Sequence, residues 1–293
     1  MLMAQGVNVA AEPCSSSNVP ASSHMKGTNG IYWGWNPDVE KGVTISEINS
    51  ATGKKASTVG LFSQISSPNG FDGHQLLNHL DEVKASGATL IASVMPNGLS
   101  FSEVTPAIAS DVASVVKQFT NQGIEVWLRF AHEMNWYVRA GTYKGNSTQF
   151  KTAWRNIHAA TKDITGCLLF WSPNNAKTLD LYEEWWPGPA YVDIVGMDLY
   201  VNTETSTFKT IYGGFYDAYA KGHNKHFAVP ETATKPDNEA LKQAWVSALA
   251  SKNVAAYPCF KSVTWFELHK SWDYRVVMSR GEAAKEATMA NFV

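Results

Sequence analysis

Eight short segments rich in β-branched and aromatic residues follow one another along this chain, and stretches with helical spacing separate them. This alternation is typical of parallel βα units. Eight units predict a closed (β/α)8 TIM barrel, and 293 residues suffice for one such domain. The eight segments are GIYWGW (30–35), TVGLFSQI (58–65), TLIASVM (89–95), EVWLRFA (125–131), LLFWSP (168–173), VDIVGMDLY (192–200), HFAVPE (226–231) and SVTWFE (262–267).

The intervening stretches carry helix signals. Apolar residues recur at helical spacing, polar side chains precede several of the stretches, and glycines follow some of them. A doubly wound sheet is the rival topology, but no glycine-rich phosphate loop follows the first strand. We expect a lead-in at residues 1–28 and one barrel over residues 29–293. The clearest helices are 72–87 between Asp72 and Gly87, 112–119 before Gly123, 147–157 behind Ser147 and 241–249 behind Asp237.

Charge and composition limit the partners. The net charge is -2 and no run of Lys or Arg occurs, which argues against nucleic acid and anionic membranes. No run approaches 18 apolar residues, and the first residues lack a signal-peptide pattern. The 11 Trp residues favour a ligand with flat apolar faces. We therefore expect a monomer that binds a neutral ligand, without a cofactor. His223 and His226 lack the supporting ligands of a metal site, so no metal is expected.

The chain has three cysteines, Cys14, Cys167 and Cys259. They are either free buried thiols or one disulfide and a leftover thiol. Cys14 precedes the first strand and Cys259 precedes the eighth, and these strands become neighbours when a barrel closes. A Cys14–Cys259 disulfide across the bottom of the barrel is the prediction, with Cys167 as the free thiol.

The fourth segment ends in an unusual group of polar residues, in the stretch WLRFAHEMNW at 127–136. In a (β/α)8 barrel the chemistry lies at the carboxyl ends of the strands, where His132 and Glu133 fall. If Glu133 points inward, alternation along the strand also turns Trp127 and Arg129 inward. An inward arginine requires a carboxylate nearby.

The seventh segment supplies that second carboxylate, since it is apolar until Pro230 and Glu231. Paired carboxyl groups suit the cleavage of glycosidic bonds, because one must donate a proton while the other attacks or activates water. Glu267, which ends the eighth segment, competes with Glu231 for the second role.

Four motifs together resemble glycoside hydrolase family 26, a mannanase-containing family of clan A: RFAHEMN beside a Trp, FWSPN, YVDIVGMDLY and PET. Members of that family are retaining (β/α)8 enzymes. The resemblance implies that Glu133 is the acid/base and Glu231 the nucleophile. It also implies that His132 borders the sugar at the cleaved bond, that Tyr200 hydrogen-bonds the nucleophile and that Trp265 forms the sugar platform.

Four further residues are candidates for substrate contact or for barrel structure. Arg129 either supports the barrel or touches the nucleophile. Asp198 and Tyr200 lie on the same expected side of the sixth strand, and we favour Tyr200 for the site. Trp136 is expected to face the sugar. Asn174 either reaches a sugar hydroxyl or makes a turn.

The resulting hypothesis is a secreted, retaining endo-β-glycanase that hydrolyses a neutral β-linked polysaccharide, with β-1,4-mannan as the first substrate. The alternatives are β-1,3-glucan or β-1,3-xylan, because HEMNWYVRAG and the Thr-Ala-Thr after Glu231 differ from the usual family pattern. The chain resembles a divergent branch that includes fungal secreted proteins. A hypothesis of another class is a carbohydrate-binding barrel that has lost catalysis.

Overall fold

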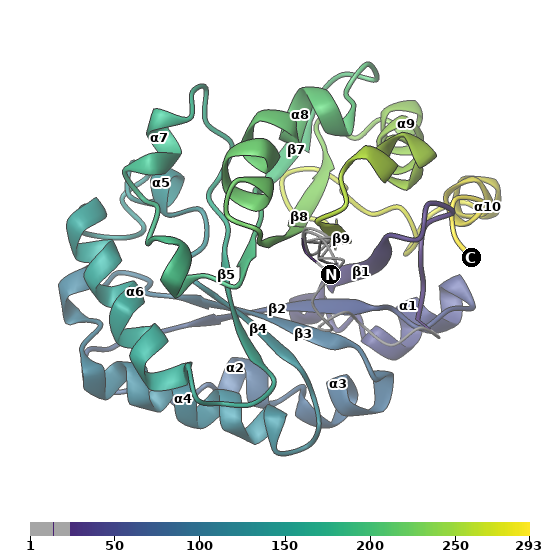
Figure 1. The fold of residues 1–293 in the computed structure, drawn as a ribbon. Helices are drawn as coiled ribbons and strands as arrows, with labels where there is room; N and C mark the ends of the chain where they lie inside the picture. The colour runs from purple at the N-terminus through teal and green to yellow at the C-terminus, as the bar shows by residue number, and fades with distance from the viewer. Residues whose placement is uncertain (1–13, 15–23) are drawn as a thin grey trace, which may run out of the picture.

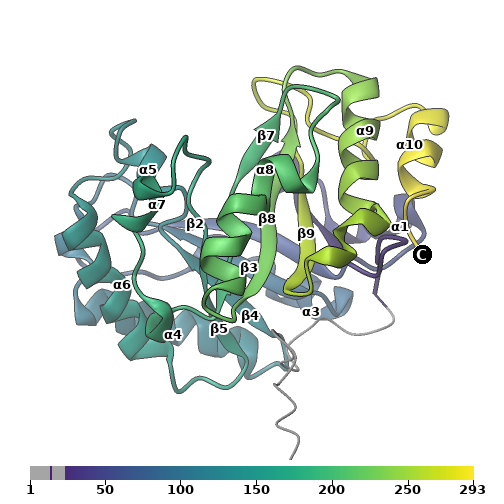
Figure 2. The same cartoon turned by 45° about the horizontal axis from the view of Figure 1, so that its top comes forward.

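A computed structural model of the protein describes Cys14 and residues 24–293. Most of the expected lead-in, residues 1–13 and 15–23, lies outside the described residues. The described part forms a closed parallel barrel in the order β6-β5-β4-β3-β2-β1-β9-β8, and a β6–β8 pairing closes it (Figures 1 and 2). This confirms the predicted (β/α)8 fold. The strands are β1 Tyr32–Pro37, β2 Thr58–Gln64, β3 Thr89–Met95, β4 Val126–Phe130, β5 Cys167–Trp171, β6 Ile194–Val195, β7 Leu199–Val201, β8 His226–Thr234 and β9 Phe260–Glu267.

The sixth barrel strand is broken into β6 and β7, which corrects the continuous strand expected over 192–200. β6 pairs with the start of β8 and β7 with its end. Next to the break Gly196 passes close to β8, where a Cβ atom would lie 2.0 Å from the Ala228 carbonyl oxygen. Asp198 then bridges to Asn174 beyond the end of β5. The break therefore places Asp198 over the barrel mouth.

Helices surround the barrel (Figures 1 and 2). The helix expected over 72–87 is two helices, because His79 departs from helical geometry at φ -108° and ψ 7°. Gly87 ends the second in the left-handed region, as predicted. Asn146 and Asn238, each one residue from the expected cap, accept hydrogen bonds at the starts of α6 and α9. The helices are α1 Ile45–Thr52, α2 His74–Leu77, α3 Leu80–Ser86, α4 Pro106–Thr120, α5 Met134–Tyr137, α6 Ser147–Thr161, α7 Asp180–Glu183, α8 Phe208–Phe215 (continued by a π-helix at Tyr216–Lys221), α9 Glu239–Ala250 and α10 Glu282–Met289, with 3-10 turns at Val39–Lys41, Phe101–Glu103, Pro189–Tyr191 and Lys252–Ala256.

Two apolar cores hold this architecture. The larger one joins the outer faces of the strands to the helices. The smaller one fills the barrel and consists of Ile91, Trp127, Phe170, Ile194 and Ala228. Trp127 thus points inward, as strand alternation predicted. The next inward residue along β4 is Arg129. The barrel interior is therefore apolar around Trp127 and becomes polar toward the carboxyl ends of the strands.

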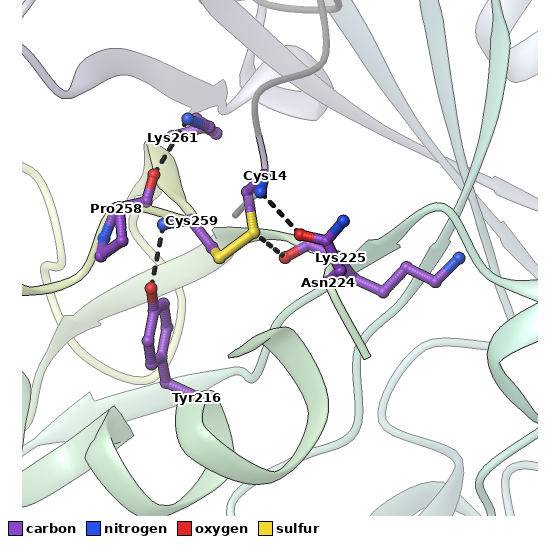
Figure 3. The surroundings of a disulfide bond; sticks show 7 residues. All are labelled: Cys14, Tyr216, Asn224, Lys225, Pro258, Cys259 and Lys261. Atoms are coloured by element: carbon purple, nitrogen blue, oxygen red, sulfur yellow. Dashed lines mark hydrogen bonds between the residues drawn. A yellow bond between two sulfur atoms is a disulfide. The ribbon is translucent and has the colours of Figure 1, made fainter. Parts of the chain in front are cut away.

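A disulfide joins Cys14 to Cys259 with Cα atoms 5.1 Å apart, which confirms the predicted pairing (Figure 3). Cys259 precedes β9, and its amide donates to the hydroxyl of Tyr216, 2.9 Å away. The Cys14 amide donates to Asn224 Oδ1 at 2.7 Å. Cys167 is free, and burial, followed by the charge of Asp193, raises the pKa of its thiol to about 12.

Removing this disulfide should destabilise the fold. In a Cys14→Ser, Cys259→Ser variant we expect the free energy of unfolding to fall by about 2–4 kcal/mol, because the open chain regains conformational freedom. Urea unfolding under oxidising conditions measures the change. Cys167→Ser is the matched control and should stay close to wild type. Equal unfolding curves for the double variant and the wild type would show that the bridge adds no stability.

Candidate active site

Arg129 organises the carboxyl ends of the strands. Its side chain is fully buried, and its Nε donates to Ser172 Oγ at 2.6 Å. Nη1 donates to Ser93 Oγ at 3.1 Å and to Glu231 Oε2 at 3.3 Å, while Nη2 donates to Asp198 Oδ2. The inward arginine was expected to need a nearby carboxylate, and the structure provides two, Glu231 and Asp198. One guanidinium fixes groups from β3, from the end of β5, from the β6–β7 break and from β8.

Glu133 reaches the barrel mouth through a turn. Ala131 and Glu133 adopt left-handed φ values of 46° and 51°, which non-glycine residues rarely adopt. The Glu133 amide donates to the Ser172 carbonyl oxygen at 2.9 Å, and this bond holds the turn. β4 has ended at Phe130, so the expected alternation from Trp127 and Arg129 does not extend to Glu133. Such strained backbone is common at functional sites.

The Glu133 carboxyl group has an unusual environment. Burial, and then the charge of Glu231, raise its pKa to about 7. Hydrogen bonds to the side chains of Asn174 and Asp198 and the charge of Arg129 act in the opposite direction. A carboxyl group with this pKa is partly protonated near neutral pH and is able to serve as a general acid.

Glu231 lies at an irregularity in β8. The pairing of β8 with β9 shifts register between Val229 and Thr232, where Pro230 has no amide to donate to a ladder. Glu231 Oε2 accepts from Arg129 and Oε1 accepts from the Tyr200 hydroxyl. Hydrogen bonds to both oxygens fix the orientation of this carboxylate.

Tyr200 and His132 are held in their neutral forms. Burial and then the charges of Glu231 and Glu133 raise the pKa of Tyr200 well above its usual range, so the phenol remains a donor. Burial and then the charges of Arg129 and Lys270 hold the pKa of His132 well below its usual range. The His132 ring packs against Tyr137 at 5.5 Å between centroids, and its Nδ1 has no partner among the described residues.

A cavity of about 420 Å³ opens beside Glu231 and His132. It runs from the nucleophile candidate past aromatic residues toward α2 and the loop after β1. Asn174, Trp136 and Glu133 do not line it. Its lining consists of Pro37, Asp38, Val39, Glu40, Gly60, Leu61, Phe62, Gln64, His74, Gln75, Asn78, His79, Met95, His132, Tyr137, Glu231, Phe266, Leu268 and Lys270.

The expected Trp265 platform is not supported by the structure. The Trp265 side chain is fully buried, and its Nε1 donates to the Tyr274 carbonyl oxygen at 2.9 Å. Phe266, the next residue, lines the cavity instead and packs against Tyr200 at 5.5 Å between centroids. Successive residues of a strand face opposite sides, so Phe266 faces the cavity and Trp265 faces away from it.

Trp136 and Asn174 remain candidates for substrate contact. Trp136 is 48% exposed on α5, with the Arg139 guanidinium 5.5 Å from its ring centroid. The Asn174 side chain hydrogen-bonds Glu133, and its backbone exchanges two hydrogen bonds with the Asn135 side chain. Asn174 therefore both shapes the turn and contacts the acid candidate, two roles that the sequence left open.

Glu267 has a structural environment. It is fully buried and accepts hydrogen bonds from the amides of Val276, Val277 and Met278 at 2.7–2.9 Å. Burial raises its pKa to about 7, against the effect of these amides. Glu267 therefore anchors the loop that follows β9, and this favours Glu231 over Glu267 as the carboxylate of the site.

Sequence reasoning missed Phe62, Tyr137, Phe266 and Lys270, which line the cavity. Phe62 carried a signal, because it lies near the end of the second predicted strand. Tyr137 follows Glu133 by one helical turn. Lys270 lies in a loop without a pattern that distinguishes it from any exposed lysine.

Two negative findings concern the described residues. Cys14 and residues 24–293 contain no group of three His, Cys, Asp or Glu side chains that would hold a metal ion. Within the same residues no helix has the length and apolarity needed to cross a membrane.

Comparisons with known proteins agree on one family. The model of glycosyl hydrolase family 26 matches residues 95–277. Two mannan endo-1,4-β-mannosidases, from Bacillus subtilis (strain 168) and Bacillus subtilis, are 27% identical over 58% of this chain and 31% identical over 32% of it. The matched regions span only 46% and 28% of those relatives.

Solved structures show the same fold. A modular endo-β-1,4-mannanase from Cellulomonas fimi is 16% identical, with a TM-score of 0.69 over 90% of this chain and 71% of that one. The Bacillus subtilis mannanase man26 is 19% identical, with a TM-score of 0.63 over 87% and 84%. Because the family model covers more than half of the sequence, the chain belongs to glycosyl hydrolase family 26.

Proposed function

We propose that the protein is a retaining endo-β-glycanase that hydrolyses β-1,4-mannan. The observation that carries the proposal is the pair of buried carboxyl groups at the ends of β4 and β8. Glu133 has a pKa near 7, and Glu231 is fixed by Arg129 and Tyr200. An acid and a carboxylate in one site are the groups that a retaining glycosidase needs.

The reaction has two displacements. In the first, a Glu231 oxygen forms a bond to the anomeric carbon while the bond to the leaving oxygen breaks, and the Glu133 proton passes to that oxygen. In the second, Glu133 removes a proton from water as the water oxygen attacks the anomeric carbon and releases Glu231. The configuration at that carbon is inverted twice and hence retained.

The neighbouring groups assist these steps. Arg129 and Tyr200 keep both oxygens of Glu231 in place before the attack and stabilise its charge. His132 is neutral and lines the cavity beside Glu231, so its ring is placed to contact a sugar there. Phe266 and Phe62 supply an apolar wall for the carbon–hydrogen face of a pyranose.

β-1,4-Mannan is the proposed substrate because the curated relatives are mannan endo-1,4-β-mannosidases. β-1,3-Glucan and β-1,3-xylan are alternatives with the same chemistry. We also propose that residues 29–293 form one catalytic domain that acts as a monomer. The disulfide supports secretion, since such bonds persist in oxidising compartments.

Incubation with mannan, lichenan, β-1,3-glucan and β-1,3-xylan tests the proposal. We expect mannan to release oligosaccharides whose new reducing ends first appear in the β configuration by NMR. If only another glycan released products, that glycan would replace mannan as the proposed substrate. Reducing ends that first appear in the α configuration would contradict retention. Binding without products from any glycan would indicate the carbohydrate-binding barrel. A Glu231→Ala preparation controls for contaminating hydrolases.

Trp136 should contribute to polymer binding. We expect Trp136→Ala to raise KM for mannan about 5-fold with little change in kcat, since stacking on an exposed indole is worth about 1 kcal/mol. Trp136→Phe retains an aromatic face and is the matched control. Steady-state kinetics measure the split, and an unchanged KM in Trp136→Ala would remove this residue from the binding surface.

A further inference from the structure

Asp198 occupies a rigid position at the break between β6 and β7. Its amide donates to the Pro173 carbonyl oxygen at 3.0 Å, and its carbonyl oxygen accepts from the Asn175 amide at 3.1 Å. The residue has no exposed surface. The backbone around Asp198 therefore leaves its carboxyl group little freedom to move.

The contacts of the Asp198 side chain are unequal. Oδ2 accepts from the Arg129 guanidinium. Oδ1 is buried and has no N–H or hydroxyl donor among the described residues. The side chain also hydrogen-bonds Glu133, which is itself a carboxyl group. Two carboxyl groups hydrogen-bond each other only when one of them carries a proton.

Charge balance also favours a resident proton. Glu133, Asp198 and Glu231 would together carry three negative charges around one buried guanidinium, that of Arg129, while Lys270 lies on the cavity wall. His132 is neutral and offers no compensation. The other titratable groups near Glu133 are phenols whose pKa values are raised by burial first and then by neighbouring charges, so they stay neutral: Tyr137, Tyr143 and Tyr200.

We propose that Glu133 and Asp198 hold one proton between them, which makes Asp198 a positioning residue that sets the acidity of Glu133. The inference rests on the proposed function for its role in the reaction. The shared proton itself is a property of the free protein and does not depend on any substrate.

The shared proton accounts for both displacements. Before the first displacement, the Glu133–Asp198 pair carries one negative charge, Glu231 carries another and Arg129 carries one positive charge, so the net charge of these four groups is -1. After it, Glu231 is a neutral ester while Glu133 and Asp198 are both ionised, so the net charge is again -1. The ionised pair then takes a proton from the attacking water. The Asp198 charge makes Glu133 a stronger base in this step.

Asp198→Asn tests the role in catalysis. Asparagine keeps an oxygen for Arg129 and presents an N–H to Glu133, and it removes the neighbouring negative charge. Both changes favour ionised Glu133, so the alkaline limb of kcat/KM on mannan should move down by about one pH unit or more. An aryl glycoside with a good leaving group should be less affected. Asp193→Asn, on the approach to β6, is the matched control and should leave the limb unchanged.

Infrared spectroscopy tests the proton without any activity. The wild-type spectrum minus the Glu133→Gln spectrum should show a protonated-carboxyl band that titrates near neutral pH. Subtracting the two spectra removes the band of Glu267, whose pKa is also raised to about 7 and which is present in both proteins. In Asp198→Asn the Glu133 band should disappear at lower pH.

The outcomes are separable. If Asp198→Asn does not fold, a difference spectrum between wild type and Glu133→Gln that lacks a titrating carboxyl band would still overturn the proposal. An unshifted alkaline limb and an unshifted band in a folded Asp198→Asn would show that Asp198 only anchors Arg129. A protein without hydrolytic activity would overturn the proposed function, yet the infrared result would still decide the shared proton.

Discussion

Glu231→Gly should lower mannan hydrolysis by at least about 10³-fold, because the variant lacks the group that forms the covalent bond. The fold should persist, since Glu231 lies at the rim, is 7% exposed and leaves Arg129 paired with Asp198. Circular dichroism and urea unfolding check this. Added azide should restore turnover of an activated β-glycoside and give an α-glycosyl azide, since azide then attacks from the side that Glu231 occupied.

The matched variant is Glu133→Ala, in which the nucleophile remains. The glycosyl-enzyme still forms from an activated substrate, and azide should intercept it to give the β-azide. Glu267→Gly provides the other comparison, since Glu267 binds three amides of the loop after β9. An α-azide from Glu133→Ala, or azide rescue of Glu267→Gly, would place the nucleophile on another strand.

Much of the fold was predictable from local patterns. Seven of the eight predicted segments correspond to single strands, because β-rich runs between helical stretches report local preferences. The sixth is two short strands, β6 and β7, which pair with the start and the end of β8. Ile194 and its partner His226 are 32 residues apart in sequence, and a pairing over that separation leaves no local pattern.

The disulfide could be predicted only because the barrel was predicted to close. Cys14 and Cys259 are 245 residues apart, so nothing local relates them. The prediction that the first and eighth strands are neighbours was enough to pair them. β1 and β9 are indeed adjacent in register, from Tyr32 opposite Ser262 onward.

Orientation was harder to predict than location. The family resemblance implied Trp265 as the sugar platform, whereas the structure buries Trp265 and places the adjacent Phe266 on the cavity wall. An inward Glu133 was the condition from which the directions of Trp127 and Arg129 were predicted, and the structure brings Glu133 to the barrel mouth by a left-handed turn after β4 has ended. Side-chain direction at strand ends depends on turns and bulges that periodicity does not describe.

The contacts of Asp198 could not be predicted from the sequence. The sequence placed Asp198 and Tyr200 on one side of a strand and gave no reason to connect Asp198 with Glu133, 65 residues earlier. The connection arises because Arg129 gathers buried carboxylates from separate strands. Removing that guanidinium is therefore the most direct test of how the site is held together.

Arg129→Leu should destabilise the folded protein by about 3–5 kcal/mol near pH 8, because Asp198 and Glu231 would remain buried without their cation. Hydrolysis should also fall steeply, since Glu231 loses one of its two fixing hydrogen bonds. Arg129→Lys is the matched control. It keeps the charge and loses the planar fork that reaches Ser172, Ser93, Glu231 and Asp198, so it should recover stability better than activity.

The pH dependence of Arg129→Leu distinguishes this cause from a simple packing defect. The Arg129 charge lowers the pKa values of Glu133 and Asp198, so its removal raises them further above their unfolded values. A carboxyl group with a raised folded pKa binds more protons in the folded state, so stability falls as pH rises toward that pKa. Urea unfolding at about pH 5 and about pH 8 should therefore show the smaller deficit at pH 5. A deficit that is equal at both values would mean that the lost contacts of the arginine side chain, and not unpaired carboxylates, account for the instability.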